Sequence, residues 1–318
     1  MSAPISLRLS LRQPAQIEIS SPLARGVLRL GERGSRRLRR KLVRSAFSLV
    51  HRRLGLPARA VMRLENGTQF PVDCADTAFL DFAARLARDG AVEPEVTALF
   101  THLAPRLSVV YDIGANWGYY PLLLGTDPRF KGEIHAFEIA PRTAEGLGRL
   151  VRSAGIEARV RVHRYGLWRL DGEVRLTRER HSYLARIVAE EYRGGSDRVP
   201  VRRLDGLDLP APDLIKIDVE GHETDVLLGG LELVRRRHPM IVFESWFDAE
   251  NRGTMLAPLE LLEGSGYALF RPTWHPAAAA AEGRLDLEPL AAAARPAIAL
   301  SLNLVAVHPA QAASLPAP

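Results

Sequence analysis

The stretch VVYDIGANWGYYPLLL, residues 109–124, decides the fold. It opens with an apolar run that ends at Asp112, turns through Gly114, Asn116 and Gly118, and closes with a second apolar run of helical character. Residues without bulky side chains let the backbone turn sharply and let a ligand approach it closely. A strand, a glycine turn and a helix in this order predict an α/β protein that binds a ligand where its strands end.

The rest of the chain alternates between apolar runs rich in Val and Ile and helical patterns. The apolar runs cover residues 108–113, 134–138, 159–165, 213–219, 240–245 and 300–307. The main helical patterns cover residues 93–103, 117–124, 141–154, 222–236 and 255–264. Strands that alternate with helices predict a doubly wound, mostly parallel sheet with helices on both faces. A hairpin with an Asn66-Gly67 turn is expected before this sheet, over residues 61–73.

The glycine turn argues against a nicotinamide cofactor. A dinucleotide site uses the spacing G-x-G-x-x-G, whereas this loop reads G-x-N-x-G and has Tyr119 where the third glycine should stand. The carboxylate of Asp112 is also unsuited to a pyrophosphate and well suited to a cationic ligand. S-adenosylmethionine carries an ammonium and a sulfonium and no phosphate, so it fits this loop better.

A second carboxylate, Glu138, closes the next strand in the sequence IHAFEIAP, residues 134–141. An acid about 20 residues beyond a glycine turn is where ribose hydroxyls are bound, because a carboxylate accepts hydrogen bonds from both of them. The alternative is a surface glutamate at the end of a strand. The spacing favours the ribose site.

A third group of acids lies in DLIKIDVEGHETDVLLGG, residues 213–230. Asp218 ends the strand, and Glu220, His222 and Glu223 come directly after it. Charged side chains gathered at the end of a strand are costly to bury, which is typical of a functional site. Acidic residues also favour the first turn of a helix, and the two interpretations are compatible.

In these stretches the chain resembles the FkbM family of S-adenosylmethionine-dependent methyltransferases. The resemblance rests on YDIGANWGYY (111–120), AFEIAP (136–141), RLDGLDLPAPDLIKIDVEGHETDVLLGG (203–230), HPMIVFESW (238–246) and SLNLVAVHP (301–309). It implies a class I methyltransferase sheet of seven strands, of which six are parallel and one is antiparallel. It also implies methyl transfer to a hydroxyl oxygen of a sugar, a glycolipid or a secondary metabolite.

The resemblance further implies a role for each matching residue. It places Asp112, Gly114, Asn116 and Gly118 along the methionine part of the cofactor, Glu138 at its ribose, and Asp218 beside the methyl donor. Glu220 and Glu223 belong to the same acidic loop as Asp218. The segments expected to choose the acceptor lie near residues 177–198 and 272–299, where neither spacing nor resemblance is informative.

An alcohol is a weak nucleophile, so a base must take its proton as the new bond forms. The candidate bases are Glu220, His222, Glu223 and Glu244, and the last of these ends a further strand and is expected beside Asp218. The sequence leaves the choice among them open. Asp218, Glu220 and Glu244 could instead hold a divalent metal ion that polarises the acceptor, although nothing in the sequence requires a metal.

Charge is unevenly distributed along the chain. Its net charge is +6, but residues 1–60 hold 14 Lys and Arg against Glu18 and Glu32, and the remainder carries −6. An acidic main domain is a poor footprint for a phosphate backbone, so a nucleic-acid methyltransferase is a weaker alternative. A non-catalytic binding module that keeps the fold is another. We expect a basic N-terminal extension over residues 1–60 and a methyltransferase domain over residues 61–318, with its core at 90–309.

The extension contains one clear pattern. Residues 1–34 have mixed polarity and no sustained period, which predicts little regular structure. Residues 36–53 combine an apolar helical face with many arginines, and such a helix lies either on an anionic membrane or against the main domain. The single cysteine, Cys74, allows no internal disulfide, and no apolar run is long enough to span a bilayer. We therefore expect a cytoplasmic protein, with peripheral contact to the inner face of the membrane if the helix binds lipid.

Overall fold

The computed structural model describes residues 5–10, 16–19, 59–64, 67–73, 92–177, 187–188, 193–245, 252–276, 282–290 and 302–314. The basic segment 36–53, for which an amphipathic helix is expected, lies outside the described residues, and so does Cys74. Among the helices of the described residues, none combines the length and the apolar character that crossing a bilayer demands.

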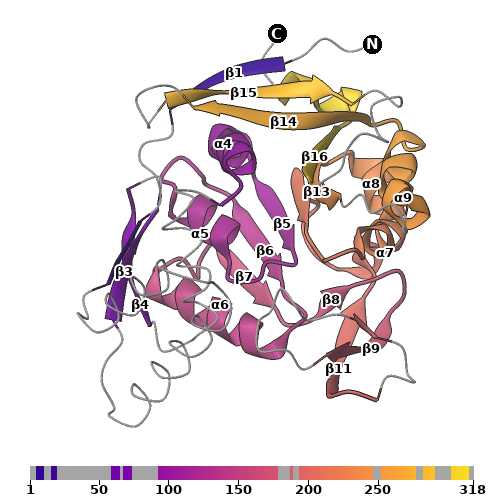
Figure 1. The fold of residues 1–318 in the computed structure, drawn as a ribbon, viewed down its shortest axis with the longest axis horizontal. Helices are drawn as coiled ribbons and strands as arrows, with labels where there is room; N and C mark the ends of the chain where they lie inside the picture. Colours follow the sequence, from indigo (N-terminus) through magenta and orange to yellow (C-terminus); the bar gives the residue numbers. More distant parts are fainter. Residues whose placement is uncertain are drawn as a thin grey trace, which may run out of the picture.

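A nine-stranded sheet forms the centre of the molecule (Figure 1). Its strands lie in the order β1-β15-β14-β16-β13-β12-β5-β6-β7. In that order their bounds are Ile5–Ser10, Glu282–Pro289, Ala268–Pro276, Leu302–Val307, Met240–Ser245, Leu214–Ile217, Val109–Ile113, Glu133–Phe137 and Val160–His163.

Seven of these strands form the sheet that the sequence predicts. Strands β7, β6, β5, β12 and β13 are parallel neighbours, β16 is antiparallel to β13, and β14 is antiparallel to β16. Strand β14 therefore runs parallel to the first five, and β16 is the antiparallel strand. The predicted doubly wound, mostly parallel α/β fold is confirmed.

Two more strands extend the sheet beyond the seven expected. Strand β15 pairs with β14 and strand β1 pairs with β15, both in antiparallel fashion. Strand β14 contains Pro272, which weakens its strand pattern, but beyond Phe270 this strand is paired on one side only, where a proline is tolerated. The expectation of little regular structure in residues 1–34 is wrong for β1 and for β2 (Gln16–Ile19).

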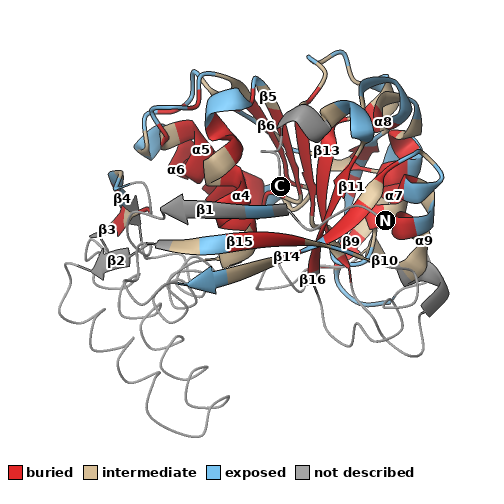
Figure 2. Ribbon diagram, turned by 90° about the horizontal axis from the view of Figure 1, so that it is seen from above, coloured by how far each residue is buried: buried red, intermediate tan, exposed pale blue. Residues whose placement is uncertain are grey.

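Helices cover both faces of the sheet (Figure 2). One face carries α4 (Pro94–Leu103), α5 (Tyr119–Thr126) and α6 (Pro141–Ser153), and the other carries α7 (Glu223–Gly229), α8 (Leu231–Arg237) and α9 (Arg252–Glu263). Short 3-10 helices lie at Ala104–Arg106, Leu204–Gly206 and Pro309–Ser314. The single helix expected over residues 222–236 is in fact two helices, with Gly230 between them.

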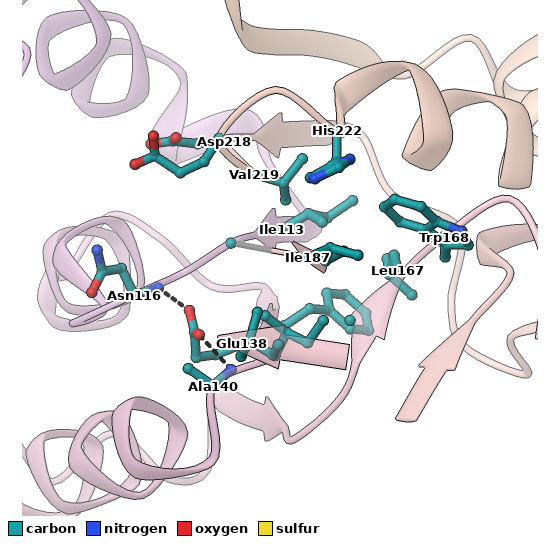
Figure 3. Close-up of a pocket in the computed structure, with 16 residues that line it drawn as sticks. Ile113, Asn116, Glu138, Ala140, Leu167, Trp168, Ile187, Asp218, Val219 and His222 are labelled. Carbon is teal, nitrogen blue, oxygen red and sulfur yellow. Dashed lines mark hydrogen bonds between the residues drawn. The ribbon is translucent and has the colours of Figure 1, made fainter. Parts of the chain in front are cut away.

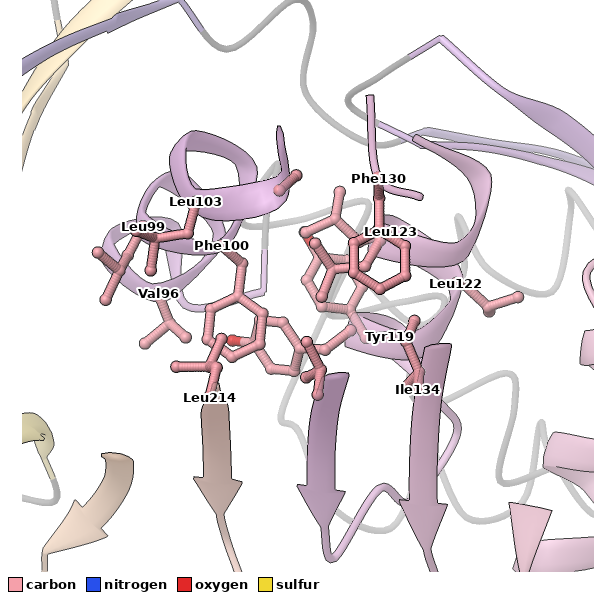
Figure 4. Packing of buried hydrophobic residues seen from close by; sticks show 14 of the residues in the cluster. Val96, Leu99, Phe100, Leu103, Tyr119, Leu122, Leu123, Phe130, Ile134 and Leu214 are labelled. Carbon is pink, nitrogen blue, oxygen red and sulfur yellow. The ribbon is translucent and has the colours of Figure 1, made fainter. Parts of the chain in front are cut away.

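Alternate residues of each strand face opposite helical layers, because successive side chains of a strand point to opposite faces. Val110 of β5 belongs to the core under α4, α5 and α6, whereas Tyr111 and Ile113 belong to the core under α7, α8 and α9. Figure 4 shows the first core, where Phe100 of α4 and Tyr119 of α5 pack over the strands. This alternation places Asp112, which lies between Tyr111 and Ile113, on the α4 and α5 side.

Two small sheets flank the main one. The sheet of order β10-β9-β11-β8 lies beside α7 and consists of Ile187–Val188, Gly172–Thr177, Ser196–Arg202 and Gly166–Leu167. The sheet of order β2-β3-β4 contains the predicted hairpin, formed by β3 (Arg59–Arg63) and β4 (Gln69–Asp73). Its turn is closed by the amide of Leu64, which donates to the carbonyl of Thr68 at 2.9 Å.

Candidate active site

The strand order of the main sheet reverses between β5 and β12. From β5 the chain continues to β6 and β7 on one side, and later crosses to β12 and β13 on the other side. In an open α/β sheet such a reversal leaves a crevice at the carboxyl ends of the strands, where ligands bind. The three acidic stretches that the sequence singles out follow β5, β6 and β12, so all three end at this crevice.

Gly114 brings the ends of β5 and β12 into direct contact. Its amide donates to the carbonyl of Phe137 at 2.9 Å, and its φ of +81° lies in the left-handed region that favours glycine. A Cβ atom at this position would lie 1.8 Å from the carbonyl oxygen of Asp218. Only a glycine therefore allows the turn after β5 to touch the turn after β12.

The rest of the glycine turn is anchored to its neighbours. Asn116 also has a left-handed φ, of 49°, and its amide donates to Glu138 Oε2 at 2.8 Å. A Cβ atom at Gly118 would lie 2.1 Å from Leu147 Cδ1 of helix α6. Gly118 thus serves the packing of the turn against α6.

A cavity opens beside these turns (Figure 3). It encloses about 780 Å³ of space that no protein atom fills, part of it open to solvent. Six of the predicted site residues line it, namely Gly114, Asn116, Glu138, Asp218, Glu220 and His222. The other four predicted residues, Asp112, Gly118, Glu223 and Glu244, are not among the residues that line it.

Glu138 connects the cavity to two turns at once. Its Oε2 accepts from the amide of Asn116 and its Oε1 accepts from the amide of Ala140, both at 2.8 Å. The side chain is only 6% exposed, and burial raises the pKa of Glu138 to about 7, although the two amide donors oppose this shift. Each carboxylate oxygen has two lone pairs, so Glu138 can still accept hydrogen bonds from a ligand in the cavity.

Asp112 lies beneath the cavity wall. It is 2% exposed, and its Oδ2 atom is buried without a hydrogen-bond partner among the described residues. Burial raises the pKa of Asp112 to about 7, against the opposing attraction of Lys216. An unpartnered buried carboxylate oxygen is costly to maintain unless a ligand or an ion satisfies it.

The loop after β12 is held together from within. Glu220 lines the cavity with a left-handed φ of 54°. Glu223 Oε1 accepts from the amides of Val219 and Gly221, both at 3.2 Å, and its side chain is buried. Glu223 therefore shapes the loop that presents Asp218 and Glu220.

His222 lies at the apolar end of the cavity. Its Nδ1 atom is 3.4 Å from Asp225 Oδ2, and its ring centroid is 4.9 Å from that of Trp168. Figure 3 shows His222 with Trp168, Leu167 and Ile187 at one end of the cavity, and Asp218, Asn116 and Glu138 at the other. The two ends thus differ in chemistry, since one is acidic and the other is aromatic and aliphatic.

Glu244 lies one strand further from the cavity. In the register of the sheet it is paired with Asn303 of β16. Within the part of the chain that the structure describes, no group of three His, Cys, Asp or Glu side chains is placed to hold a metal ion. The structure does not bring Asp218, Glu220 and Glu244 together as a metal centre.

The structure also places residues at the site that sequence reasoning did not identify. Lys216 of β12 is buried next to Asp218, and its partners Glu93 and Tyr120 come from the start of α4 and from α5. A lysine between two isoleucines in a buried strand was the available signal. Trp168 gave no comparable signal, since it lies in a segment of irregular polarity.

The charges and shape of the cavity fit S-adenosylmethionine. Three acids at neighbouring strand ends, Asp112, Glu138 and Asp218, are opposed by one buried cation, Lys216. Such a site favours a ligand that carries positive charge. The lone pairs of Glu138 suit ribose hydroxyls, and the apolar end with Trp168 suits a flat heterocycle.

The order of the seven main strands and the acidic crevice define the class of protein as a class I methyltransferase fold. Residues 112–269 match the model of the methyltransferase FkbM domain, so the chain contains an FkbM methyltransferase domain. The resemblance seen in the sequence is thereby confirmed. The family implies S-adenosylmethionine as the cofactor.

Similar proteins have also been characterised. The chain is 30% identical over 146 residues to the hexuronic acid methyltransferase AglP of Haloferax volcanii. This match covers 45% of the chain and 58% of AglP, so the chain spans little more than half of that relative.

Two solved structures are weakly similar. The FkbM methyltransferase of Methylobacillus flagellatus gives a TM-score of 0.40 at 20% identity, over 57% of this chain and 44% of that one. A putative O-methyltransferase from Klebsiella pneumoniae gives a TM-score of 0.38 at 15% identity, over 86% and 91%. Values this low say nothing about substrate or mechanism.

Proposed function

We propose that this protein is an S-adenosylmethionine-dependent O-methyltransferase that acts on a hydroxyl of a sugar or a sugar-containing molecule. The observation that carries the proposal is the cavity at the strand reversal. Glu138 and Asp218 line it at the ends of two parallel strands, and Asp112 lies buried near the end of the strand between them. The FkbM domain supports the class of reaction, since it covers all three of these strand ends.

The cofactor-binding roles follow from the two ends of the cavity. Glu138 accepts from the ribose hydroxyls with the lone pairs that its two backbone donors leave. Asp112 and Asp218 attract the ammonium of the methionine part, and Gly114 and Asn116 shape the turn against which it lies. Trp168 and Leu167 enclose the base at the apolar end. When bound, S-adenosylmethionine would supply a methyl group on a sulfonium, whose thioether would leave as the acceptor oxygen bonds to the methyl carbon.

Proton removal from the acceptor is proposed for an acid of the loop after β12. Glu220 is the first candidate, because it lines the cavity two residues from Asp218. Glu223 is a weaker candidate, since its Oε1 already accepts from two amides. His222 is weaker as well, because it lies with Trp168 at the apolar end. Glu244 stays a candidate on β13, the strand next to β12, although it does not line the cavity.

A sugar acceptor is supported by the relative with a known substrate class. AglP is a hexuronic acid methyltransferase, and 58% of its length aligns with this chain. We further propose that the protein is cytoplasmic and that its basic segment, residues 36–53, contacts an anionic membrane. Such a location would agree with a glycolipid acceptor. Nucleic-acid methylation is disfavoured by the acidic main domain, and a non-catalytic binding module is the remaining alternative.

Two measurements test the proposal. S-adenosylmethionine binding is measured by calorimetry, and transfer of a radiolabelled methyl group is measured on a panel of uronic acids and neutral sugars. Mass spectrometry of extracted glycans, from cells with and without the protein, then searches for one lost methyl group. Absence of cofactor binding would leave only the binding-module alternative.

The base is tested by four separate substitutions, Glu220→Gln, His222→Asn, Glu223→Gln and Glu244→Gln. Loss of the base should lower turnover by about 10²–10⁴-fold while the cofactor affinity stays normal. We expect Glu220→Gln to show this pattern. If none of the four slows turnover, solvent or the substrate itself removes the proton.

A further inference from the structure

Lys216 is a charged residue in the middle of the buried sheet. It lies on β12 with its side chain only 3% exposed. Its Nζ atom is 2.9 Å from Asp218 Oδ2 and 3.9 Å from Glu93 Oε2, and it lies 5.0 Å from the centroid of the Tyr120 ring. Its register partner on β5 is Asp112.

A buried ammonium is costly unless its partners compensate for the lost water. Burial disfavours the charge on Lys216, but the attraction of Asp218, Glu93 and Asp112 outweighs that cost and raises the pKa of Lys216 above its usual value. Lys216 is therefore protonated at neutral pH. It is the fixed positive charge among the acids of this site.

The position of Lys216 is itself held from outside the cavity. Tyr120 of α5 donates its hydroxyl to Glu93 Oε2, and Glu93 in turn faces Lys216. Glu93 has a left-handed φ of 47°, a conformation that costs a non-glycine residue energy and that tends to persist at functional sites. The residue before α4 thus adopts a strained conformation and contacts the cation beneath the cavity.

We propose that Lys216 is a positioning residue of the cofactor site. Its ammonium fixes the carboxylate of Asp218 at the cavity wall and places a positive charge beside Asp112, and Glu93 and Tyr120 hold Lys216 in place. The inference rests on the proposed function, because it takes the cavity to be the site of a cationic donor.

The proposal has a consequence for the pH dependence of binding. The groups that face Lys216 and its two aspartates are Glu93 before α4, Tyr120 from α5, Glu138 after β6 and Glu223 from α7. The negative charges of Asp218, Glu93 and Glu138 raise the pKa of Asp112, whereas the positive charge of Lys216 lowers it. Without Lys216, Asp112 should hold its proton to a higher pH, and a cationic ligand needs this carboxyl group ionised.

The experiment follows S-adenosylmethionine affinity by calorimetry from pH 6 to pH 9. In the full chain, Lys216→Met should weaken binding at least tenfold at pH 7 and move the midpoint of the pH profile upward by about one unit. Lys216→Arg keeps the charge and should restore the midpoint to near that of the wild type. Lys131→Met, which removes an exposed lysine, is the matched control and should leave both quantities unchanged.

Glu93→Gln provides a test of opposite sign in case Lys216→Met fails to fold. It removes a negative charge that raises the pKa of Asp112, so the midpoint should move to lower pH. A folded Lys216→Met variant with the wild-type midpoint, or a Glu93→Gln variant whose midpoint stays or rises, overturns the inference. If the wild type itself binds no donor at any pH, the proposed function fails instead.

Discussion

The two ends of the cavity are built in different ways. The acidic end consists of residues that directly follow parallel strands of the main sheet, namely Asn116, Glu138 and Asp218. The apolar end is completed by Leu167, Trp168, Leu176 and Ile187, which belong to the small sheet beside α7 or to its connections. One end therefore comes from the main sheet, while the other is contributed by the segment between β7 and β12.

The difference indicates a division of labour. Charged groups held by backbone amides, as Glu138 is, are fixed in direction and suit recognition of specific polar atoms. Aliphatic and aromatic side chains recognise shape, and they tolerate substitution more readily. We therefore expect the acidic end to set the affinity for the cofactor and the apolar end to adjust it.

The largest effect is expected at the acidic end. Asp112→Asn and Glu138→Gln should each weaken S-adenosylmethionine binding by about 10–100-fold, since hydrogen bonds to charged groups contribute roughly 1.5–3 kcal/mol. Calorimetry at pH 8 measures the affinity. Glu145→Gln, on the exposed side of α6, is the matched control. Wild-type affinity in both site variants would refute the assigned cofactor site.

A smaller effect is expected at the apolar end. Trp168→Ala should weaken binding by about 3–10-fold, because an aromatic contact contributes roughly 0.5–1.5 kcal/mol beyond the area it buries. Trp168→Phe should retain most of the affinity, and Leu170→Ala, at an exposed neighbouring position, should retain all of it. If Trp168→Ala weakened cofactor binding more than Asp112→Asn and Glu138→Gln do, the apolar end and not the acidic end would set the affinity.

The smallest effect concerns stability in the absence of cofactor. The pKa of Asp112 is about 7 in the folded chain and about 3.9 in an unfolded one, so folding favours its protonated form. Its contribution is therefore favourable below about pH 4 and is lost as the pH rises towards 7.

Asp112→Asn should accordingly melt about 2–4 °C above the wild type at pH 8, and the difference should shrink at pH 5. Scanning calorimetry without cofactor measures both. Asp208→Asn, at an exposed position, serves as the control and should show no such pH-dependent difference. Equal melting temperatures of Asp112→Asn and the wild type at pH 8 would mean that the buried carboxylate is already satisfied.

The acidic end could be predicted from the sequence because it follows local rules. A strand that ends in an acid and leads into a glycine turn fixes both the fold and the side of the sheet, as at Asp112 and Gly114. Glu138 and Asp218 then follow from the parallel arrangement of the strands. The sequence could not tell that Gly118 and Glu223 shape turns while Gly114 and Glu220 line the cavity, since this depends on contacts with Leu147 and Val219.

The apolar end and the outer strands could not be predicted, because they depend on contacts between distant segments. Strand β1 is stable only as a partner of β15, and β14 tolerates Pro272 only because one of its sides is unpaired there. The segments near residues 177–198 and 272–299, where neither spacing nor resemblance is informative, contain all of β10 and β15 and parts of β11 and β14. Glu93 contacts Lys216 because the chain before α4 passes close to β12, and no local sequence pattern specifies this path.

The two amide contacts of Glu138 have a consequence for the thermodynamics of recognition. Asn116 and Ala140 already donate to this carboxylate, so its side chain is oriented by the backbone before a ligand binds. An arriving ribose would find its acceptor preorganised and would lose little entropy in ordering the protein. The carboxylate proposed to bind the ligand thus also connects two backbone turns. A substitution that changes one of these roles therefore changes the other.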